Sequence, residues 1–358
     1  MSADLVIILT AVLVSTASAL VGTFLVLRRM ALMSDAISHA VLPGIVLAFW
    51  LSGGERATLP ALLGAAAAGL ATVTLVEWLT RTGRVKNDAA IGIVFPALFS
   101  LGVLAVSFYF RNVHLDLDAV LYGEIAYAPF NILSVGGREL GPESLWIMGT
   151  LTLLNLVFVL VFYKELKLST FDTGLAAALG FMPGVLHYLL MSLVSITAVG
   201  AFQSVGAILI VAFIIIPPAT AYLLTQRLPL MIALAVGIGA VSSVLGYLFA
   251  ILLDASIAGM MATVAGVLFG LALLFSPLQG LVTQAIRRSR QRQEVAARLL
   301  VSHLAHHDRP VPISEVQEEF GWNPRFLQRV QEVALRAGWV QLEGTSLRVK
   351  AERIAKNL

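Results

Sequence analysis

The sequence predicts an all-α polytopic membrane protein with eight or nine transmembrane helices, followed by a small cytoplasmic α+β domain. Of its 358 residues, 58% are hydrophobic and only 13% are charged, and the mean hydropathy is +0.89. Apolar runs of about 20 residues, long enough to cross the roughly 30 Å hydrocarbon core of a bilayer, recur as far as residue 280. After Pro277 the chain becomes polar and basic, which indicates a second kind of domain.

The first part of the chain contains nine apolar segments. They lie near 5–27, 31–52, 58–80, 90–110, 144–163, 183–202, 204–226, 229–253 and 257–280. Because Pro43–Gly44 interrupts the second segment, the first two can also form one broken unit, which gives eight spans and an internal N-terminus. We expect a transmembrane domain over 1–282, a basic linker over 283–292 and a cytoplasmic domain over 293–358.

The distribution of basic residues orients the spans. If the C-terminal domain is cytoplasmic, strict alternation also places the turns at 28–30, 81–88, 164–182 and 226–228 in the cytoplasm. Together with the first arginines after the last span, that side carries ten Lys and Arg residues, against three on the other side. This asymmetry agrees with the positive-inside rule.

The stretch from Arg28 to Gly44 places charged residues between two apolar segments. A charged residue within a membrane span costs roughly 2.5–3.5 kcal/mol on insertion scales, so such residues usually face a bundle interior or a water-filled path. Asp35 and His39 are four residues apart and share one face of a predicted helix. Carboxylate oxygen and imidazole nitrogen suit Zn²⁺, Mn²⁺ or Fe²⁺, which makes this pair the candidate metal site.

Two ligands are too few for selective binding of a metal ion. A second copy of the chain across a two-fold axis brings the set to two Asp and two His. The competing interpretation is that Ser34 and Asp35 only cap a helix whose first turn contains Ser38 and His39.

A polar strip at 163–167 leads into a short, alanine-rich helix between two spans. Phe171, Asp172, Ala176, Ala177 and Gly180 belong to this segment, and Gly180 ends it. A short helix at the membrane face can dock onto a partner and transmit its movement. The alternative is a surface helix that has no partner.

Pro217–Pro218 lies in the middle of an apolar segment. Two consecutive prolines remove two backbone donors, so we expect a broken helix here. Broken membrane helices line cavities or pack against protein, and this break is a candidate part of a transport pathway. A simple structural kink is the alternative.

The C-terminal domain is predicted to be a winged-helix-like α+β domain. Its expected helices cover 293–305, 313–320 and 324–337, and its expected strands cover 339–342 and 346–350. Ser314 is a candidate cap of the second helix, and Asn323 is the expected N-cap of the third. Contacts with DNA would use Arg325, Arg329 and Arg336 on the third helix. Nothing in the sequence indicates readout of bases, which disfavours a nucleic-acid partner.

Five motifs, in this order, resemble the membrane permeases of bacterial zinc, manganese and iron ABC importers. They are LRRMALMSDAISHAVLPG at 27–44, KNDAAIGIVF at 86–95, DAVLYGEI at 118–125, FYKELKLSTFD at 162–172 and SVGAILIVAFIIIPPATA at 204–221. The resemblance covers roughly residues 5–280. Some of these permeases carry a C-terminal extension that is similar to the predicted winged-helix-like domain.

The resemblance implies a multi-pass protein of the bacterial cytoplasmic (inner) membrane. Its partners would be two ATPase subunits, a second permease copy or paralogue, an extracytoplasmic metal-binding protein and membrane lipid. It implies that Asp35 and His39 face the path of the metal, and that Phe171–Gly180 is similar to the helix that couples a permease to its ATPase. No cofactor would be bound permanently, since the divalent Mn, Zn or Fe ion is the transported substrate.

The chain has no GxxxxGK[ST] phosphate loop and no pairing of a nucleophile with a base, so we expect a permease subunit that is not an enzyme. We therefore expect an ATP-driven divalent metal importer that works by alternating access at the interface between two permeases. One alternative is a membrane-bound, metal-responsive regulator that uses the winged helix on DNA. A proton-driven secondary transporter is another.

Overall fold

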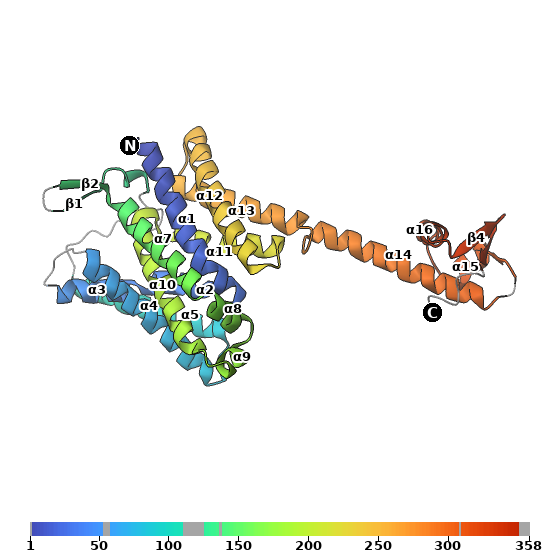
Figure 1. Ribbon diagram of the computed structural model, residues 1–358, viewed down its shortest axis with the longest axis horizontal. Coiled ribbons are helices and arrows are strands. Elements are labelled where there is room, and N and C mark those ends of the chain that lie inside the picture. The colour runs from blue at the N-terminus through green and yellow to red at the C-terminus, as the bar shows by residue number, and fades with distance from the viewer. Residues whose placement is uncertain (1, 53–57, 110–124, 136–137, 308, 351–358) are drawn as a thin grey trace. The chain divides into compact units, whose positions relative to one another are not determined.

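The computed structural model describes residues 2–52, 58–109, 125–135, 138–307 and 309–350 (Figure 1). It divides into two compact units, Met1–Leu273 and Leu274–Leu358. The loop motif at 118–125, apart from Ile125, lies outside the described residues.

Helices make up nearly all of the first unit. They are α1 (Ala3–Leu27), α2 (Ala31–Ala40), α3 (Leu42–Leu51), α4 (Thr58–Arg81), α5 (Asn87–Tyr109), the 3₁₀ turn η1 (Ile125–Tyr127), α7 (Glu143–Val161), α8 (Tyr163–Phe171), α9 (Thr173–Ala178), α10 (Pro183–Val205), α11 (Ala207–Leu224), α12 (Leu228–Leu253) and α13 (Ile257–Phe275). A small antiparallel hairpin, β1 (Ile132–Val135) and β2 (Arg138–Pro142), precedes α7.

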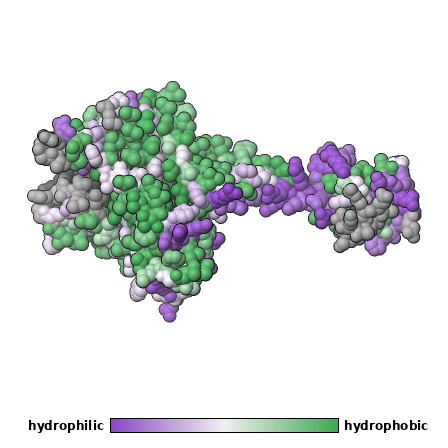
Figure 2. Space-filling model, viewed as in Figure 1, coloured by the Kyte–Doolittle hydropathy of each residue, from purple (hydrophilic) through white to green (hydrophobic). Residues whose placement is uncertain are grey.

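Nine helical segments of the described chain are long and apolar enough to cross a membrane, if α2 and α3 are taken together as one span. This number matches the nine segments counted in the sequence. Large exposed apolar side chains cover these helices, as a lipid-facing surface requires, whereas the C-terminal unit has a more hydrophilic surface (Figure 2).

Helix α1 is the most buried of these nine segments. It packs against α7, α10, α11 and α12, and Val14, Val21 and Phe24 are fully buried along it. Polar contacts add to this packing: the amide nitrogen of Asn155 donates to the carbonyl of Ala17 at 3.1 Å. Since α1 ends at Leu27, its position also determines where the Arg28–Gly44 stretch begins.

Two helix crossings depend on glycine because the backbones are in contact. A Cβ atom at Gly22 of α1 would collide with the carbonyl oxygen of Ile214 in α11. Gly44 of α3 and Gly64 of α4 face each other, and a Cβ on either would collide with the carbonyl oxygen of the other. Small residues permit such close approach of membrane helices, where dispersion contacts drive association.

The predicted helix break at Pro217–Pro218 is wrong, because α11 is continuous from Ala207 to Leu224. Both prolines are buried, and their fixed φ is compatible with a helix even though they donate no hydrogen bond. Pro218 has no N–H to donate to the carbonyl of Ile214, and this carbonyl packs against Gly22 of α1. The preceding span, α10, is separated from α11 by the turn at Gly206 (φ 81°).

The described residues of the C-terminal unit form three helices and a three-stranded sheet. Its elements are α14 (Leu281–Ala305), β3 (Val311–Pro312), α15 (Ile313–Phe320), α16 (Pro324–Arg336), β4 (Val340–Glu343) and β5 (Ser346–Val349). The strands are antiparallel, in the order β3-β5-β4, and Leu300, Val330 and Leu347 are buried in the core.

The ends of these elements differ in part from the expected ones. Residues 283–292, expected as a linker, belong to α14. Asn323 caps α16 as predicted, since its side chain accepts a hydrogen bond from the backbone of Arg325 at 3.1 Å. Ser314 does not cap α15, because that helix begins one residue earlier and Pro312 occupies the N-cap position.

We predict that Gly22→Val destabilises the permease, because the added side chain must separate α1 from α11. Overpacking of this kind typically costs about 1–3 kcal/mol. Gly237→Val is the matched control, since Gly237 is an exposed residue of α12 where a Cβ atom meets nothing within 4 Å. Thermal unfolding of the detergent-purified protein should show a lower midpoint for Gly22→Val only, and equal midpoints for the two variants would contradict the close crossing.

Candidate functional site

Asp35 and His39 lie on α2, which only three residues separate from α1. The connecting turn is Arg28–Met30, and Arg29 within it has a left-handed φ of 58°. Met30 occupies the N-cap position of α2, so Asp35 lies in the second turn of the helix and not at its start. The interpretation of Ser34 and Asp35 as a helix cap is therefore wrong.

The two serines of this helix bond to its backbone. Ser34 Oγ donates to the carbonyl of Ala31, and Ser38 Oγ donates to the carbonyl of Ser34, each at 2.8 Å. Both side chains are buried, which leaves Asp35 and His39 as the polar groups on the open side of α2.

The Asp35 and His39 side chains lie next to each other. His39 Nε2 is 3.4 Å from Asp35 Oδ1, and the side chains are 39% and 41% exposed, respectively. The His39 ring also packs near two rings of α5, with centroid distances of 5.8 Å to Phe95 and 6.4 Å to Phe99. An accessible carboxylate and imidazole beside an apolar wall can provide two ligands for a divalent cation.

These two residues do not form a complete metal site. Among the described residues, no group of three or more His, Cys, Asp or Glu side chains is arranged to hold a metal ion. Further ligands must come from outside this group, as the sequence-based argument for a second copy of the chain requires.

The segment predicted to couple to a partner consists of α8 and α9. Asp172 separates them and caps α9, since its side chain accepts a hydrogen bond from the backbone of Leu175 at 2.9 Å. Gly180 (φ 85°) ends the turn, with hydrogen bonds from Gly180 N to Ala177 O and from Phe181 N to Ala176 O.

The predicted coupling residues of this segment differ in their exposure to solvent. Phe171 and Ala177 are exposed, whereas Ala176 is fully buried and faces its own chain. Sequence reasoning missed the apolar side chains that accompany Phe171 on the surface. They are Leu175, Leu179 and Met182.

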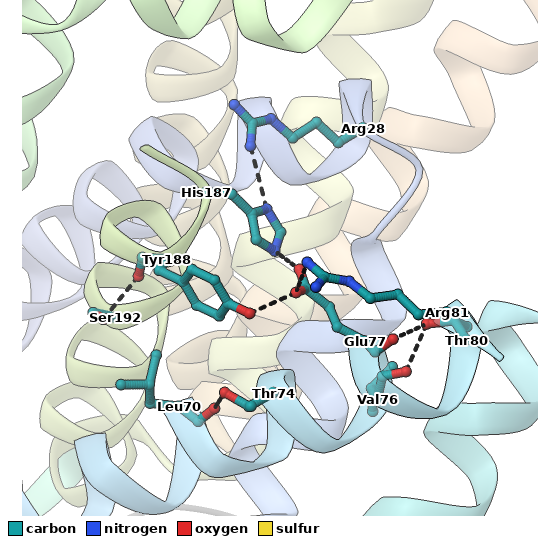
Figure 3. Close-up of polar contacts among 10 residues, drawn as sticks. All are labelled: Arg28, Leu70, Thr74, Val76, Glu77, Thr80, Arg81, His187, Tyr188 and Ser192. Carbon is teal, nitrogen blue, oxygen red and sulfur yellow. Dashed lines mark hydrogen bonds and ion pairs between the residues drawn. The ribbon is translucent and has the colours of Figure 1, made fainter. Parts of the chain in front are cut away.

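Sequence reasoning did not bring together a polar cluster at the ends of α1, α4 and α10 (Figure 3). Glu77 of α4 is at its centre: Oε1 lies 2.6 Å from His187 Nε2, and Oε2 accepts a hydrogen bond from the Tyr188 hydroxyl at 2.7 Å. Arg81, four residues further along α4, lies 3.5 Å from Glu77 Oε2. A Glu in one apolar segment and a His in another were the available signals, but their pairing depends on the tertiary fold.

Arg28 joins this cluster to α8. Its Nε donates to Thr170 Oγ1 at 3.1 Å, its Nη2 donates to Ser169 Oγ at 3.0 Å, and its Nη1 lies 3.4 Å from His187 Nδ1. Burial lowers the pKa of Arg28, although a guanidinium remains protonated at neutral pH. Because Arg28 can only donate, His187 Nδ1 must accept, and its ring proton lies on Nε2 beside Glu77.

The arginines predicted as DNA contacts, Arg325, Arg329 and Arg336, are all exposed on α16. On the same helix, the ring centroid of Phe326 lies 5.0 Å from the guanidinium of Arg292 in α14. This cation–π contact links α14 to α16.

Comparison with known proteins agrees with the arrangement of spans. The model of the ABC 3 transport family matches residues 5–276. The zinc transport system membrane protein TroD of Treponema pallidum (strain Nichols) is 48% identical over 355 residues, which cover 98% of this chain and 96% of that protein. The manganese transport system membrane protein MntD of Bacillus subtilis (strain 168) is 47% identical over 296 residues, which cover 83% of this chain and 100% of that protein.

A solved structure is also similar. PsaBC from Streptococcus pneumoniae in complex with Fab contains a chain that is 33% identical to this one, with a TM-score of 0.63, and the match covers 76% of this chain and 91% of that chain. The family match, the relatives and the nine apolar helical segments lead to one conclusion: the chain belongs to the ABC 3 transport family and is a multi-pass membrane permease of the metal-type ABC transporters, a subunit that is not itself an enzyme.

Proposed function

We propose that this permease forms the membrane path of an ATP-driven importer of Mn²⁺, Zn²⁺ or Fe²⁺, and that Asp35 and His39 hold the ion during transport. The observation that carries the proposal is the accessible Asp35–His39 pair on α2, with 3.4 Å between Oδ1 and Nε2. The relatives, which are named as zinc and manganese transport proteins, support a divalent metal as substrate without deciding which one.

The depth of the pair supports a place on the transport path. His39 lies eight residues after the start of α2, which corresponds to about 12 Å along the helix at a rise of 1.5 Å per residue. If the Arg28–Met30 turn lies at the cytoplasmic face, His39 is well within a hydrocarbon core of roughly 30 Å. A hydrophobic core is a costly place for a histidine and an aspartate unless they serve a function.

A second permease copy or paralogue would complete the ligand set. One chain contributes one carboxylate and one imidazole, and a two-fold related chain would double both, to the four ligands typical of a divalent transition metal. Alternating access at this interface would open the site first to the outside, where a metal-binding protein delivers the ion, and then to the cytoplasm.

The cytoplasmic end of the permease would bind the ATPase subunits. Two of the turns that the basic residues predict to be cytoplasmic, 28–30 and 164–182, are joined by the contacts of Arg28 with Ser169 and Thr170. At this end, the side chains of Phe171, Leu175, Leu179 and Met182 are exposed and apolar. An exposed apolar group beside a capped helix is a suitable docking surface for a partner.

The C-terminal unit would be a cytoplasmic winged helix that contacts the ATPase. Its three helices and its β3-β5-β4 strand order support the winged-helix fold. The relatives are named as transport proteins, so they give no support to a membrane-bound regulator that binds DNA. The bacterial cytoplasmic membrane is the expected location of the assembly.

We predict that Asp35→Asn and His39→Gln each lower metal uptake at least tenfold, because either change removes one of the two ligands that the chain provides. Even the loss of a group that only supports a metal ligand typically costs about 10–100-fold in affinity or activity. Uptake of radiolabelled Mn²⁺ and Zn²⁺ should be measured in cells that express the whole transporter at equal membrane levels. Asp88→Asn is the control, since Asp88 is an exposed carboxylate at the start of α5.

The ion whose uptake is lost identifies the substrate. Unchanged uptake of both ions in both variants would contradict a role of Asp35 and His39 on the path.

We also predict that Leu175→Asp weakens binding of the ATPase subunit, because it places a charge within the exposed apolar group of α8–α9. Burying an unpaired charge in an interface typically costs several kcal/mol. The amount of ATPase that co-purifies with the permease should fall for this variant, whereas Thr82→Asp, an exposed site in the turn after α4, should retain it. Equal retention by both variants would exclude α9 from the interface.

A further inference from the structure

Arg28 is a partly buried charge at the end of a membrane span, and all three of its nitrogens are in use. Nε donates to Thr170, Nη2 donates to Ser169, and Nη1 contacts His187. Its neighbour Arg29 is exposed, and the Arg29 side chain has no hydrogen bond or ion pair with the described part of the chain, although its backbone N donates to the carbonyl of Val26. Two adjacent arginines therefore have different surroundings, although both contribute equally to the positive charge of the turn.

The partners of Arg28 belong to segments with different expected roles. Ser169 and Thr170 lie at the end of α8, directly before Phe171 and the Asp172 cap of α9. Arg28 itself lies in the turn before α2, whose second turn contains Asp35. One side chain thus connects the segment proposed to bind the ATPase with the helix proposed to hold the metal.

The third contact of Arg28, with His187, connects its side chain to α10 and, through Glu77, to α4. His187 accepts from Arg28 on Nδ1 and faces Glu77 on Nε2, and Glu77 also accepts from Tyr188 (Figure 3). The Glu77 carboxylate offsets the positive charge of the partly buried Arg28 across His187, whereas the Arg81 side chain is 77% exposed and remains solvated. The positive charge of Arg28 beside His187 also disfavours a metal ion at the His187–Glu77 pair.

We propose that Arg28 is a positioning residue that transmits a displacement of α8–α9 to α2, and so couples the ATPase to the Asp35–His39 pair. The proposal rests on the proposed function and extends it to a residue that touches neither metal nor ATPase. When the ATPase moves α9, the hydroxyls of Ser169 and Thr170 move with it, and the guanidinium carries this movement to the start of α2. The His187–Glu77–Tyr188 contacts provide the fixed reference on α4 and α10.

The geometry requires arginine and not only a positive charge. A planar guanidinium offers donors in several fixed directions, whereas the ammonium of lysine is a single compact group on a flexible chain. Lysine at position 28 retains the charge but cannot donate to Ser169, Thr170 and His187 at the three observed positions at once.

The test compares Arg28→Lys and Arg28→Gln with Arg29→Gln in proteoliposomes that contain the complete transporter, with Mn²⁺ and Zn²⁺ as the probes. The measured quantity is the number of metal ions taken up per ATP hydrolysed. Coupling between sites typically corresponds to about 5- to 150-fold, so we expect both Arg28 variants to lower this ratio at least fivefold and Arg29→Gln to leave it within about twofold of wild type. A residue with a merely structural role would lower the amount of active transporter and leave the ratio unchanged.

A second variant keeps the test decisive if the Arg28 variants do not reach the membrane. Ser169→Ala combined with Thr170→Val removes the two hydroxyl acceptors from the α8 side and changes no charge. Thr263→Val, at an exposed position of α13 outside the proposed metal and ATPase sites, is its matched control. We expect the double variant to lower the ratio at least fivefold, by the same coupling argument, and its control to behave as wild type.

The outcomes separate the inference from the function on which it rests. If wild type takes up metal and every variant retains its ratio of ions to ATP, Arg28 does not couple the two segments, and the proposed function stands. If wild type takes up neither Mn²⁺ nor Zn²⁺ while it hydrolyses ATP, the proposed function and the inference both fail.

Discussion

A partly buried charge at the end of a membrane span must have partners, and this constraint accounts for the contacts that surround Arg28. The guanidinium of Arg28 has three acceptors, on Ser169, Thr170 and His187, and the Glu77 carboxylate lies on the far side of His187. The bundle around it supplies the rigidity: α1 is largely buried, and Gly22 lets it meet α11 at backbone contact. With α1 fixed in this way, the short turn after it leaves α2 little freedom, and the position of Asp35 and His39 follows.

This arrangement also explains how a chain with few charged groups can have two polar sites of different character. The Glu77–His187 pair is shielded, in contact with Tyr188 and neighboured by arginine, which suits a structural contact. The Asp35 and His39 side chains are accessible, and each is the ion-pair partner of the other. Among the described residues no Lys or Arg forms an ion pair with them, which suits transient binding of an ion. Transport requires the second kind, because a site must release what it binds.

The sequence predicts the spans well because hydropathy and length decide them, and the nine apolar segments correspond to nine helical segments of the described chain. It also predicts the Asn323 cap and the helix end at Gly180, since these depend on adjacent residues, although the predicted Ser314 cap is wrong. Pro217–Pro218 was misinterpreted because a membrane helix can retain its φ angles without two hydrogen bonds when a neighbour packs closely. The partners of Arg28 were not predictable, because they lie far away in sequence and are brought together only by tertiary packing.

The central claim is that Asp35 and His39 are ligands of the transported metal, and X-ray absorption spectroscopy of the Zn²⁺-loaded, detergent-purified permease tests it most directly. The account predicts a first shell of nitrogen and oxygen at about 2.0–2.2 Å, with imidazole scattering that is lost in His39→Gln. It also predicts no sulfur scattering, since the chain contains no cysteine. Imidazole scattering that persists unchanged in His39→Gln would show that the ion binds elsewhere and would contradict the account.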